Sequence, residues 1–574
     1  MKSIAVKLLS FQLLSFLVAF ALVRSVIAQD MAIINANIAT IDPANPKAEA
    51  LIVKEGRIAA VGSKDDISKL ITAEMKVLDL DGQFLMPGFI EGHGHFLKLG
   101  EMRMNLDLTK AESWDEVVEQ VRAAAAKTPP GKWIIGRGWH QSKWDSPPSP
   151  NVEGYPTHES LSEASPNNPV LLTHASGHMD FANAYAMQMA NVTDETKDPK
   201  GGTILRTEDG SATGVFRERA SGLIHSARYR DEGQNRTTVS NLEYLNRAAV
   251  LASDECVRKG ITSFQDAGLP LSQIDYLKSV VNDRVKPRLW VMIRDSNQSL
   301  MMHMKRTRVI GHADNHLTVR AIKRAIDGAL GAHGAWLLQP YEDMPLSRGL
   351  NTRSVESIEE AAALAIKHDY QFCVHAIGDR ANREVLDIFE RQFKANPSDE
   401  PRRWRIEHAQ HLHPDDIPRF GKLGVIASMQ AVHCTSDAIF VPTRLGHRRS
   451  KDGAYVWKSL IESGAIVTNG TDAPVEDVDP IPCFHASVTR QLKPGVTFFP
   501  KQCMSRLEGL EAYTINNAKA AFEEDIKGSI EVGKLADFVV LSNDLLTCTD
   551  DEILKTKVLR TVIGGETVYS AKAE

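Results

Sequence analysis

Two histidines, His93 and His95, stand one residue apart at the end of the apolar stretch GFIEGHGHF. On a β-strand, residues i and i+2 point to the same side, so both imidazoles can face one point. Neutral imidazoles are common ligands of zinc and similar metals. The pair alone is weak evidence, because roughly half an H-x-H pair is expected by chance in this chain, and His411 and His413 form another. Its meaning depends on further ligands.

Four more polar residues end short apolar runs: Lys323 in VRAIKRAID, His375 in FCVHAIGD, His408 in RIEHAQ and Asp472 in IVTNGTDAP. Imidazole and carboxylate ligands suit zinc and leave an open position for water. Lys323 fits such a set if carbon dioxide adds to its amine, because the carbamate is anionic and can bridge two metals. A two-metal site holds a hydroxide between the ions and polarises a carbonyl group. The residue types predict one or two divalent ions, with Zn²⁺ as the first candidate.

Each of these residues also has a simpler interpretation. Lys323 could be a surface lysine or form a salt bridge to Asp327. His375 and His408 could be core histidines with satisfied hydrogen bonds. Asp472 could cap the helix that is expected after Pro474. The metal interpretation is favoured because all of these side chains occupy equivalent strand ends.

The elements that carry them alternate as short apolar strands and helical stretches such as VESIEEAAALAIKHD. This alternation predicts an α/β fold with a distorted (β/α)8 TIM-like barrel, whose catalytic residues lie at the C-terminal strand ends. The eight candidate strands are Leu85–His95, Ile261–Gly268, Arg288–Ile293, Val319–Asp327, Phe372–Gly378, Arg405–Gln410, Val425–Gln430 and Ile466–Asp472.

The rest of the chain predicts three further parts. Residues 29–84 and 525–574 alternate apolar and polar residues, which predicts a small β-sandwich built from both termini. The barrel would occupy 85–524, with an inserted subdomain at 96–250, a stretch too long for a loop. Residues 1–28 combine a basic start with an apolar run and are typical of a signal peptide, although an uncleaved membrane anchor is the alternative. We therefore expect export, to the periplasm or out of the cell, without stable membrane insertion after cleavage.

Composition narrows the partners. The formal net charge is -6, without a long basic run, which argues against nucleic acid as a main partner. None of the six cysteines forms a C-x-x-C pair, so a thiolate zinc site is not expected. Free buried thiols and a Cys483–Cys503 disulfide are both compatible with the sequence. We expect a small-molecule substrate, and a homodimer is possible.

Several motifs resemble those of one family: PGFIEGHGHF, GWHQSKWD, SGHMDFAN, IKRAIDGALGAHGAWLLQPY, VHAIGDRAN, RIEHAQ, GVIASMQAVH, GTDAPVEDVDP and GSIEVGKLADFVVL. Together they resemble the amidohydrolase superfamily, in the branch of YtcJ-like proteins and N-substituted formamide deformylases, over nearly the whole mature chain. The resemblance implies a distorted barrel with a small β-sandwich. Departures occur at Gly331-Ala332-His333 and at Gln430-Ala431, near the expected substrate pocket.

The resemblance also implies roles. His93 and His95 would bind the more buried metal, Lys323 would bridge as a carbamate, and His375 and His408 would bind the second metal. Asp472 would bind metal, take the proton from the attacking water and pass it to the leaving amine. In the insert, His178 would either orient the substrate carbonyl or structure a loop.

Other residues have plainer expectations. His411 and His413 precede a helix start and are expected in a solvated loop. Arg324 would point toward the surrounding helices, where an apolar side chain is usual. Trp139 and Trp144 could line an apolar pocket or pack in a core.

The predicted function is a metal-dependent hydrolase of carbon–nitrogen bonds other than peptide bonds. The first candidate substrate is a linear N-formyl or N-acyl amide, attacked by a metal-bound hydroxide. The alternatives are a hydrolase of cyclic amides or dipeptides, a non-catalytic metal-binding regulatory protein, and a metal-free solute-binding protein.

Overall fold

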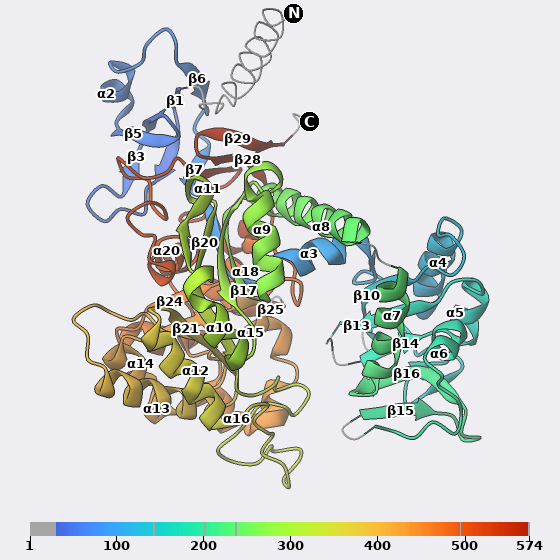
Figure 1. The fold of residues 1–574 in the computed structure, drawn as a ribbon. Coiled ribbons are helices and arrows are strands. Elements are labelled where there is room, and N and C mark those ends of the chain that lie inside the picture. The colour runs from blue at the N-terminus through green and yellow to red at the C-terminus, as the bar shows by residue number, and fades with distance from the viewer. Residues whose placement is uncertain are drawn as a thin grey trace, which may run out of the picture.

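The structure is a computed structural model that describes residues 30–571 except 142–143, 176, 178, 200–201, 236–237 and 494. The predicted signal peptide, 1–28, therefore lies outside the described residues. Figure 1 shows a central barrel, a β-rich part at the end where both termini lie, and a separate group of elements to one side.

Eight parallel strands form a nearly closed barrel in the order β24-β23-β22-β21-β20-β18-β17-β8, as predicted. Seven of the predicted strands agree with the structure to within about three residues at each end. The strands are β8 (Phe89–Gly94), β17 (Ile261–Leu269), β18 (Arg288–Ile293), β20 (Leu317–Ala325), β21 (Gln371–Ala376), β22 (Arg405–His408), β23 (Ile426–Met429) and β24 (Val467–Asn469).

The first predicted strand, Leu85–His95, is wrong as one element. The structure divides it into β7 (Phe84–Pro87), which pairs antiparallel with β27 (Phe538–Leu541) outside the barrel, and barrel strand β8. Gly88 lies between them, and a Cβ added there would come within 2.1 Å of the Thr262 side chain. Apolar residues continue through this junction, so hydrophobicity alone did not reveal it.

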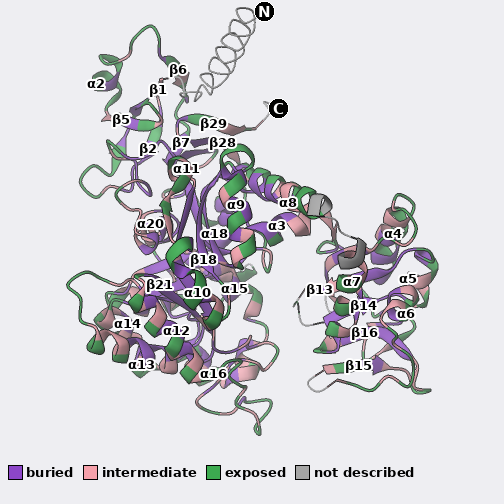
Figure 2. Ribbon diagram, in the orientation of Figure 1, coloured by how far each residue is buried: buried purple, intermediate pink, exposed green. Residues whose placement is uncertain are grey.

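Helices surround the barrel and bury one face against its strands, as Figure 2 shows by colour. In α13, Phe389 packs against Phe372 of β21, with ring centroids 6.0 Å apart, and against Trp404, at 4.9 Å. Ser354 caps the start of α12 by accepting the Ser357 N–H. The main helices after β17 are α9 (Leu271–Arg284), α10 (Asn297–Thr307), α12 (Val355–Lys367), α13 (Asp379–Ala395), α14 (Ile417–Leu423), α15 (Ala431–Asp437), α16 (Val441–Gly453), α17 (Trp457–Glu462), α18 (Pro480–Thr489), α19 (Arg506–Tyr513) and α20 (Ile515–Ala521).

Both ends of the described chain contribute to two packed sheets, which confirms the predicted sandwich. One sheet has the order β5-β4-β1-β6 and the other β29-β28-β27-β7-β2-β3. A buried ion pair, Arg288 Nε to Asp537 Oδ2 at 2.7 Å, ties barrel strand β18 to the second sheet. The strands not yet given are β1 (Met31–Ile34), β2 (Asn37–Ala39), β3 (Lys47–Ala48), β4 (Ala50–Lys54), β5 (Arg57–Gly62), β6 (Lys76–Asp79), β28 (Val558–Ile563) and β29 (Glu566–Ser570).

A six-stranded sheet, β15-β16-β14-β13-β10-β9, forms the centre of the insert. Helices α3 (Phe96–Met104) and α8 (Thr238–Arg258) lead out to it in Figure 1, but Phe96 and Ala249 belong to the barrel core. The part with cores of its own is therefore shorter than the predicted 96–250. Its elements are β9 (Leu106–Asp107), α4 (Trp114–Ala125), β10 (Ile134–Trp139), α5 (Glu159–Ala164), β13 (Val170–His174), β14 (Met179–Ala182), α6 (Ala184–Met189), β15 (Gly202–Arg206), β16 (Ala212–Glu218) and α7 (Ser221–Asn235).

Other predictions concern single side chains. Trp139 and Trp144 stack at 6.1 Å inside the core of the insert, so they are packing residues. All six cysteines are free, and Cys483 is buried with its thiol 3.1 Å from the Gly470 carbonyl. Within the described part of the chain, we find no helix with the length and apolar character needed to cross a membrane.

Candidate metal centre

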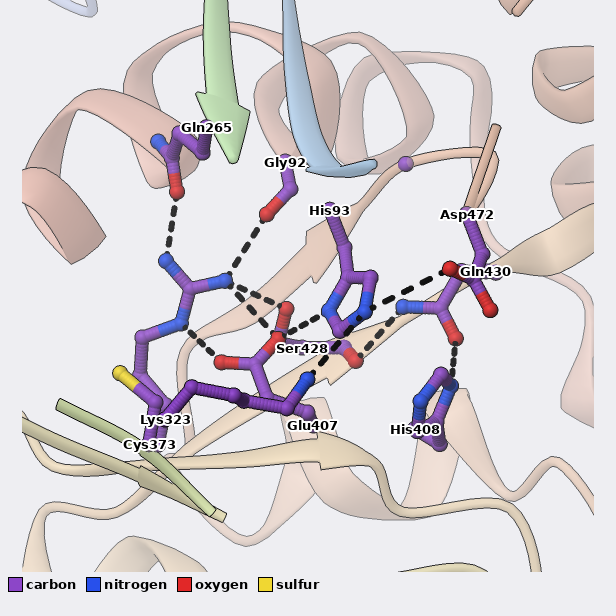
Figure 3. A network of polar contacts seen from close by, with 12 residues as sticks. Gly92, His93, Gln265, Lys323, Cys373, Glu407, His408, Ser428, Gln430 and Asp472 are labelled. Atoms are coloured by element: carbon purple, nitrogen blue, oxygen red, sulfur yellow. Dashed lines mark hydrogen bonds and ion pairs between the residues drawn. The ribbon is translucent and has the colours of Figure 1, made fainter. Parts of the chain in front are cut away.

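The six predicted ligands meet at the C-terminal mouth of the barrel. The Asp472 Oδ1 atom lies 3.6 Å from His93 Nε2 and 3.4 Å from His95 Nε2, and Lys323 Nζ lies 3.4 Å from His93 Nε2. The rings complete the cluster, with centroids 4.7 Å apart for His93 and His408 and 4.5 Å apart for His408 and His375. Figure 3 shows the side chains of His93, Lys323, His408 and Asp472 converging. The structure therefore brings together six candidate ligands from five separate places in the sequence.

The spacing of these atoms fits a divalent ion. Ligands about 2.0–2.1 Å from a tetrahedral metal lie about 3.3–3.4 Å from each other, since a tetrahedron's edge is about 1.63 times its bond length. The distances from Asp472 Oδ1 to His93 Nε2 and His95 Nε2 are close to that value, and these three residues can hold one ion together. The buried atoms His375 Nε2 and Asp472 Oδ1 also lack hydrogen-bond partners among the described residues. A bound cation would satisfy such atoms.

The protonation states match metal ligands as well. Burial, followed by the charge of Lys323, lowers the pKa of His93 to about 4 and that of His375 to about 3, so both rings are neutral at neutral pH. Burial would raise the pKa of Asp472, but its close contact with His95 and the charge of His93 hold it well below its usual range. Burial lowers the pKa of Lys323 to about 8. A neutral amine, the form that reacts with carbon dioxide, is thus accessible near neutral pH.

A buried charge network orients His93. The Glu407 carboxylate contacts His93 Nδ1, and its Oε1 lies 2.7 Å from Arg405 Nε. Arg405 also donates to the Gly92 carbonyl and the Ser428 hydroxyl. Because Nδ1 faces a carboxylate, it carries the ring proton, and Nε2 is left free to bind metal. Figure 3 shows Glu407 and Gly92 beside His93 in this network.

His408 is oriented by an amide. Its Nδ1 lies 2.6 Å from Gln430 Oε1, while Gln430 Nε2 donates to the Ser428 carbonyl. This arrangement assigns the proton of His408 to Nδ1 and frees Nε2. Gln430 is followed by Ala431, the pair at which the sequence was expected to depart from the family pattern.

The backbone is left-handed at two ligands. His408 has φ +74° and Asp472 has φ +57°, values that non-glycine residues rarely adopt. Arg405 and Glu407 point into the barrel, so simple alternation would turn His408 outward. The left-handed residue breaks that alternation and brings His408 to the same side as Glu407. Such strain at a cluster of polar residues is typical of functional sites.

The first and last barrel strands meet at this site. The Asp472 N–H donates to the His93 carbonyl and the His95 N–H to the Ala473 carbonyl, each at 2.7 Å. The buried Glu91 carboxylate accepts the N–H groups of His93 and Thr471 at 3.1 and 2.7 Å. The seam of the barrel is thus closed through the ligand residues themselves.

The remaining predictions have mixed outcomes. His178 lies outside the described residues. The prediction of a solvated loop is wrong for His411, which is 2% exposed and forms a bridge with Ala454, because the segment after β22 packs under Tyr455. Arg324 is buried, as its outward direction implied, and it donates to Asn297 and to the Lys323 carbonyl instead of packing as an apolar residue.

The sequence did not predict the contacts that four residues make at the site: Glu407, Gln430, Asp327 and Arg137. Asp327 accepts N–H groups from Trp336, Ile377 and Gly378, and its Oδ1 lies 3.5 Å from His375 Nε2, so it does not form the salt bridge to Lys323 considered above. For Glu407, a charged Arg-x-Glu pair inside an apolar strand was an available signal.

Arg137 comes from strand β10 of the insert. Burial lowers the pKa of Arg137, whereas the carboxylates of Asp472 and Asp180 act in the opposite direction. The insert therefore places a positive charge within electrostatic reach of the candidate metal centre. No sequence pattern links β10 to the end of β24.

Comparisons with known proteins point to one family. A family model described as "Amidohydrolase family" matches residues 76–569. The chain is 33% identical over 560 residues to Protein LONG AFTER FAR-RED 3 of Arabidopsis thaliana, covering 95% of this chain and 92% of the relative. It is 28% identical to the putative amidohydrolase YtcJ of Bacillus subtilis, with 91% and 96% covered. It is 27% identical to the N-substituted formamide deformylase of Arthrobacter pascens, with 94% and 98% covered.

Among solved structures, the fold is similar to that of an uncharacterized metal-dependent hydrolase from Pyrococcus furiosus. The TM-score is 0.71 at 26% identity, and the match covers 90% of this chain and all of the other. The similarity spans the barrel, the sandwich and the insert together.

Proposed function

The chain belongs to the amidohydrolase family, a family of metal-dependent hydrolases, and from this premise we propose that it hydrolyses a carbon–nitrogen bond outside peptides, in a linear N-formyl or N-acyl amide. The family and branch predicted from the sequence motifs are confirmed by the matches to YtcJ and to the formamide deformylase. The observation that carries the proposal is the convergence of Asp472, three neutral imidazoles and Lys323 at one barrel mouth.

The proposed roles follow from this geometry. His93, His95 and Asp472 would hold one divalent ion, and His375 and His408 would hold a second. When bound, a divalent ion supplies an activated water and polarises the substrate carbonyl. Zn²⁺ is the proposed ion because neutral imidazole and carboxylate are its usual ligands.

Asp472 is the proposed proton carrier. Its pKa lies well below the usual range, so it is ionised and can accept the proton of the attacking water. The leaving amine is a stronger base than the amide and takes that proton as the bond breaks. The left-handed backbone at Asp472 holds the carboxylate between His93 and His95 during both transfers.

Lys323 is proposed to carry a carbamate. It lies buried beside His93 and Glu407, and burial lowers its pKa to about 8. A positive ammonium 3.4 Å from His93 Nε2 would repel a cation bound to that atom. A carbamate reverses that charge and gives two oxygens that can bind metal.

The substrate class rests on a relative and on the fold. The relative from Arthrobacter pascens is named for removing formyl groups from N-substituted formamides. At 27% identity this supports a linear amide as the first substrate to test, and cyclic amides or dipeptides as the second.

We also propose export to the periplasm or outside the cell, because residues 1–28 resemble a signal peptide.

The test is a metal-loaded enzyme assay. Apo-protein would be reconstituted with Zn²⁺ and bicarbonate, and its metal content measured. It would then be assayed with formanilide, N-acetyl amines, dihydrouracil and a simple dipeptide. We expect release of formate or acetate, with little turnover of the dipeptide. Full metal occupancy without turnover of any amide would contradict the proposal and favour a regulatory metal-binding protein.

A further inference from the structure

A fifth histidine borders the candidate metal centre but is not one of its proposed ligands. His433 lies on α15, directly after barrel strand β23, and is only 7% exposed. Its ring is nearly parallel to that of the ligand His408, at 20°, with centroids 6.4 Å apart. The imidazole therefore lies in the wall of the barrel mouth, next to a ligand.

One hydrogen bond of His433 defines the tautomer of its ring. Gln410 Nε2 donates to His433 Nδ1 at 3.1 Å. An amide NH2 group can only donate, so Nδ1 accepts and the ring proton lies on Nε2. This Nε2–H is buried, and it has no partner in the part of the chain that the structure describes. A buried donor without a partner costs free energy, which a bound acceptor would recover.

The backbone that carries Gln410 and His433 is fixed by further hydrogen bonds. The backbone of Gln410 is fixed because its carbonyl accepts the Tyr455 N–H at 2.7 Å. The His433 N–H donates to the Gln430 carbonyl at 3.2 Å, at the start of α15. Tyr455 in turn donates its hydroxyl to Asp437, at the end of the same short helix. The unpaired donor is held in place on both sides.

We infer that His433 binds the substrate through its Nε2–H, donating to the carbonyl oxygen of the scissile amide. In an amide the nitrogen donates and its lone pair is delocalised, so the carbonyl oxygen is the acceptor that the substrate offers. Negative charge develops on that oxygen when water attacks the carbonyl carbon, and a preorganised donor stabilises it. No proton leaves His433 in this role. The inference deepens the proposed function and rests on it.

Three variants separate this role from a structural one. His433→Leu removes the donor at similar volume, and His433→Gln restores an N–H near the position of Nε2. His411→Leu is the matched control, because His411 is equally buried and both its ring nitrogens lack partners, but it packs against Tyr455. All three would be compared as Zn²⁺-loaded protein with formanilide as substrate.

The expected result is specific to the transition state. His433→Leu should lower kcat by about 10²–10³-fold with a much smaller change in KM, which is the effect of losing one oxyanion donor. Its metal content should stay at the wild-type level, because His433 is not a proposed ligand. Its melting temperature should fall, because Gln410 Nε2 loses its acceptor, His433 Nδ1. His433→Gln should recover part of kcat, and His411→Leu should keep it.

Two outcomes would overturn the inference: a kcat for His433→Leu within threefold of wild type, or loss of bound metal in that variant. If the wild-type protein turns over no amide, the proposed function fails separately. Formate binding to the Zn²⁺-loaded protein then tests His433, because formate offers an equivalent oxygen. We expect at least tenfold weaker binding by His433→Leu, and equal dissociation constants would refute the role.

Discussion

Replacing Glu407 by Gln tests whether the buried network under the ligands controls metal binding. Glu407 and Arg405 are both fully buried, and Glu407 contacts Nδ1 of His93. Burial would raise the pKa of Glu407, but Arg405 and His93 hold it well below its usual range. The side chain is thus a carboxylate, and glutamine keeps its shape while removing its charge.

The expected effect of Glu407→Gln has two parts, a loss of metal affinity and a loss of folding stability. A Gln at this position still accepts from His93 but binds the Nδ1 proton less strongly, and loss of such a partner lowers metal affinity about 10–100-fold, or about 1.4–2.8 kcal/mol. Arg405 loses its buried counter-charge, which costs about 3–5 kcal/mol of folding stability. Arg405 still donates to Gln265, Ser428 and the Gly92 carbonyl. The expected loss of folding stability is therefore near the lower end of this range.

The assay combines zinc titration of the apo-protein with urea unfolding of the apo and loaded forms. Glu359→Gln is the matched control, because Glu359 pairs with Arg391 at 3.0 Å while both side chains are exposed, at 36% and 52%. That variant should change stability by less than about 1 kcal/mol and leave zinc binding unchanged. If Glu407→Gln binds zinc as tightly as wild type, the network does not tune the metal centre, and the reasoning from His93 fails.

Further predictions concern other parts of the site and fold. Because burial lowers the pKa of Lys323 to about 8, activation of apo-protein by Zn²⁺ and ¹³CO2, at constant dissolved CO2, should rise with pH up to about 8 and then level off, with a carbamate signal in ¹³C NMR. Activation without CO2 and without that signal would contradict the carbamate. Gln430→Leu should weaken zinc binding about tenfold by removing the acceptor of His408 Nδ1, whereas Gln430→Glu should retain it, as measured by metal titration. Asp537→Asn should cost about 3–5 kcal/mol in urea unfolding, because Arg288 loses its buried partner. Burial would raise the pKa of Asp537, but Arg288 lowers it below the unfolded-state pKa of about 3.9. The stability that Asp537 contributes is therefore present above pH about 3.9 and is lost as the pH falls below that value. If Asp537→Asn loses stability in acid just as the wild type does, this assignment is contradicted.

The sequence predicted that these side chains come together, because each marks the end of a strand. His375 and His408 occur just where apolar runs stop, and parallel strands in a barrel all end at the same mouth. Strand periodicity therefore sufficed to place residues that are far apart in the chain. The junction at Gly88 was missed for the same reason, because the apolar run continues while the strand changes sheet.

The supporting residues could not be found in this way. Whether Gln430 contacts His408, or Gln410 contacts His433, depends on register between strands and on the loops that follow them. His411 was misplaced because a polar residue before a helix start is usually solvated, whereas here tertiary packing under Tyr455 buries it. Tertiary contacts of this kind have no signature in local sequence.

The seam of the barrel links the fold to the chemistry. Strands β8 and β24 join through the His93 carbonyl, the Asp472 N–H and the Glu91 carboxylate, in place of a regular ladder. A ladder would force side chains at the seam to alternate, and His93 and Asp472 could not then face one ion with His95. Opening the ladder and using a left-handed residue at Asp472 brings the ligands together. The bound ion would then reinforce the seam that these deviations leave weak, so metal binding and barrel closure should stabilise one another.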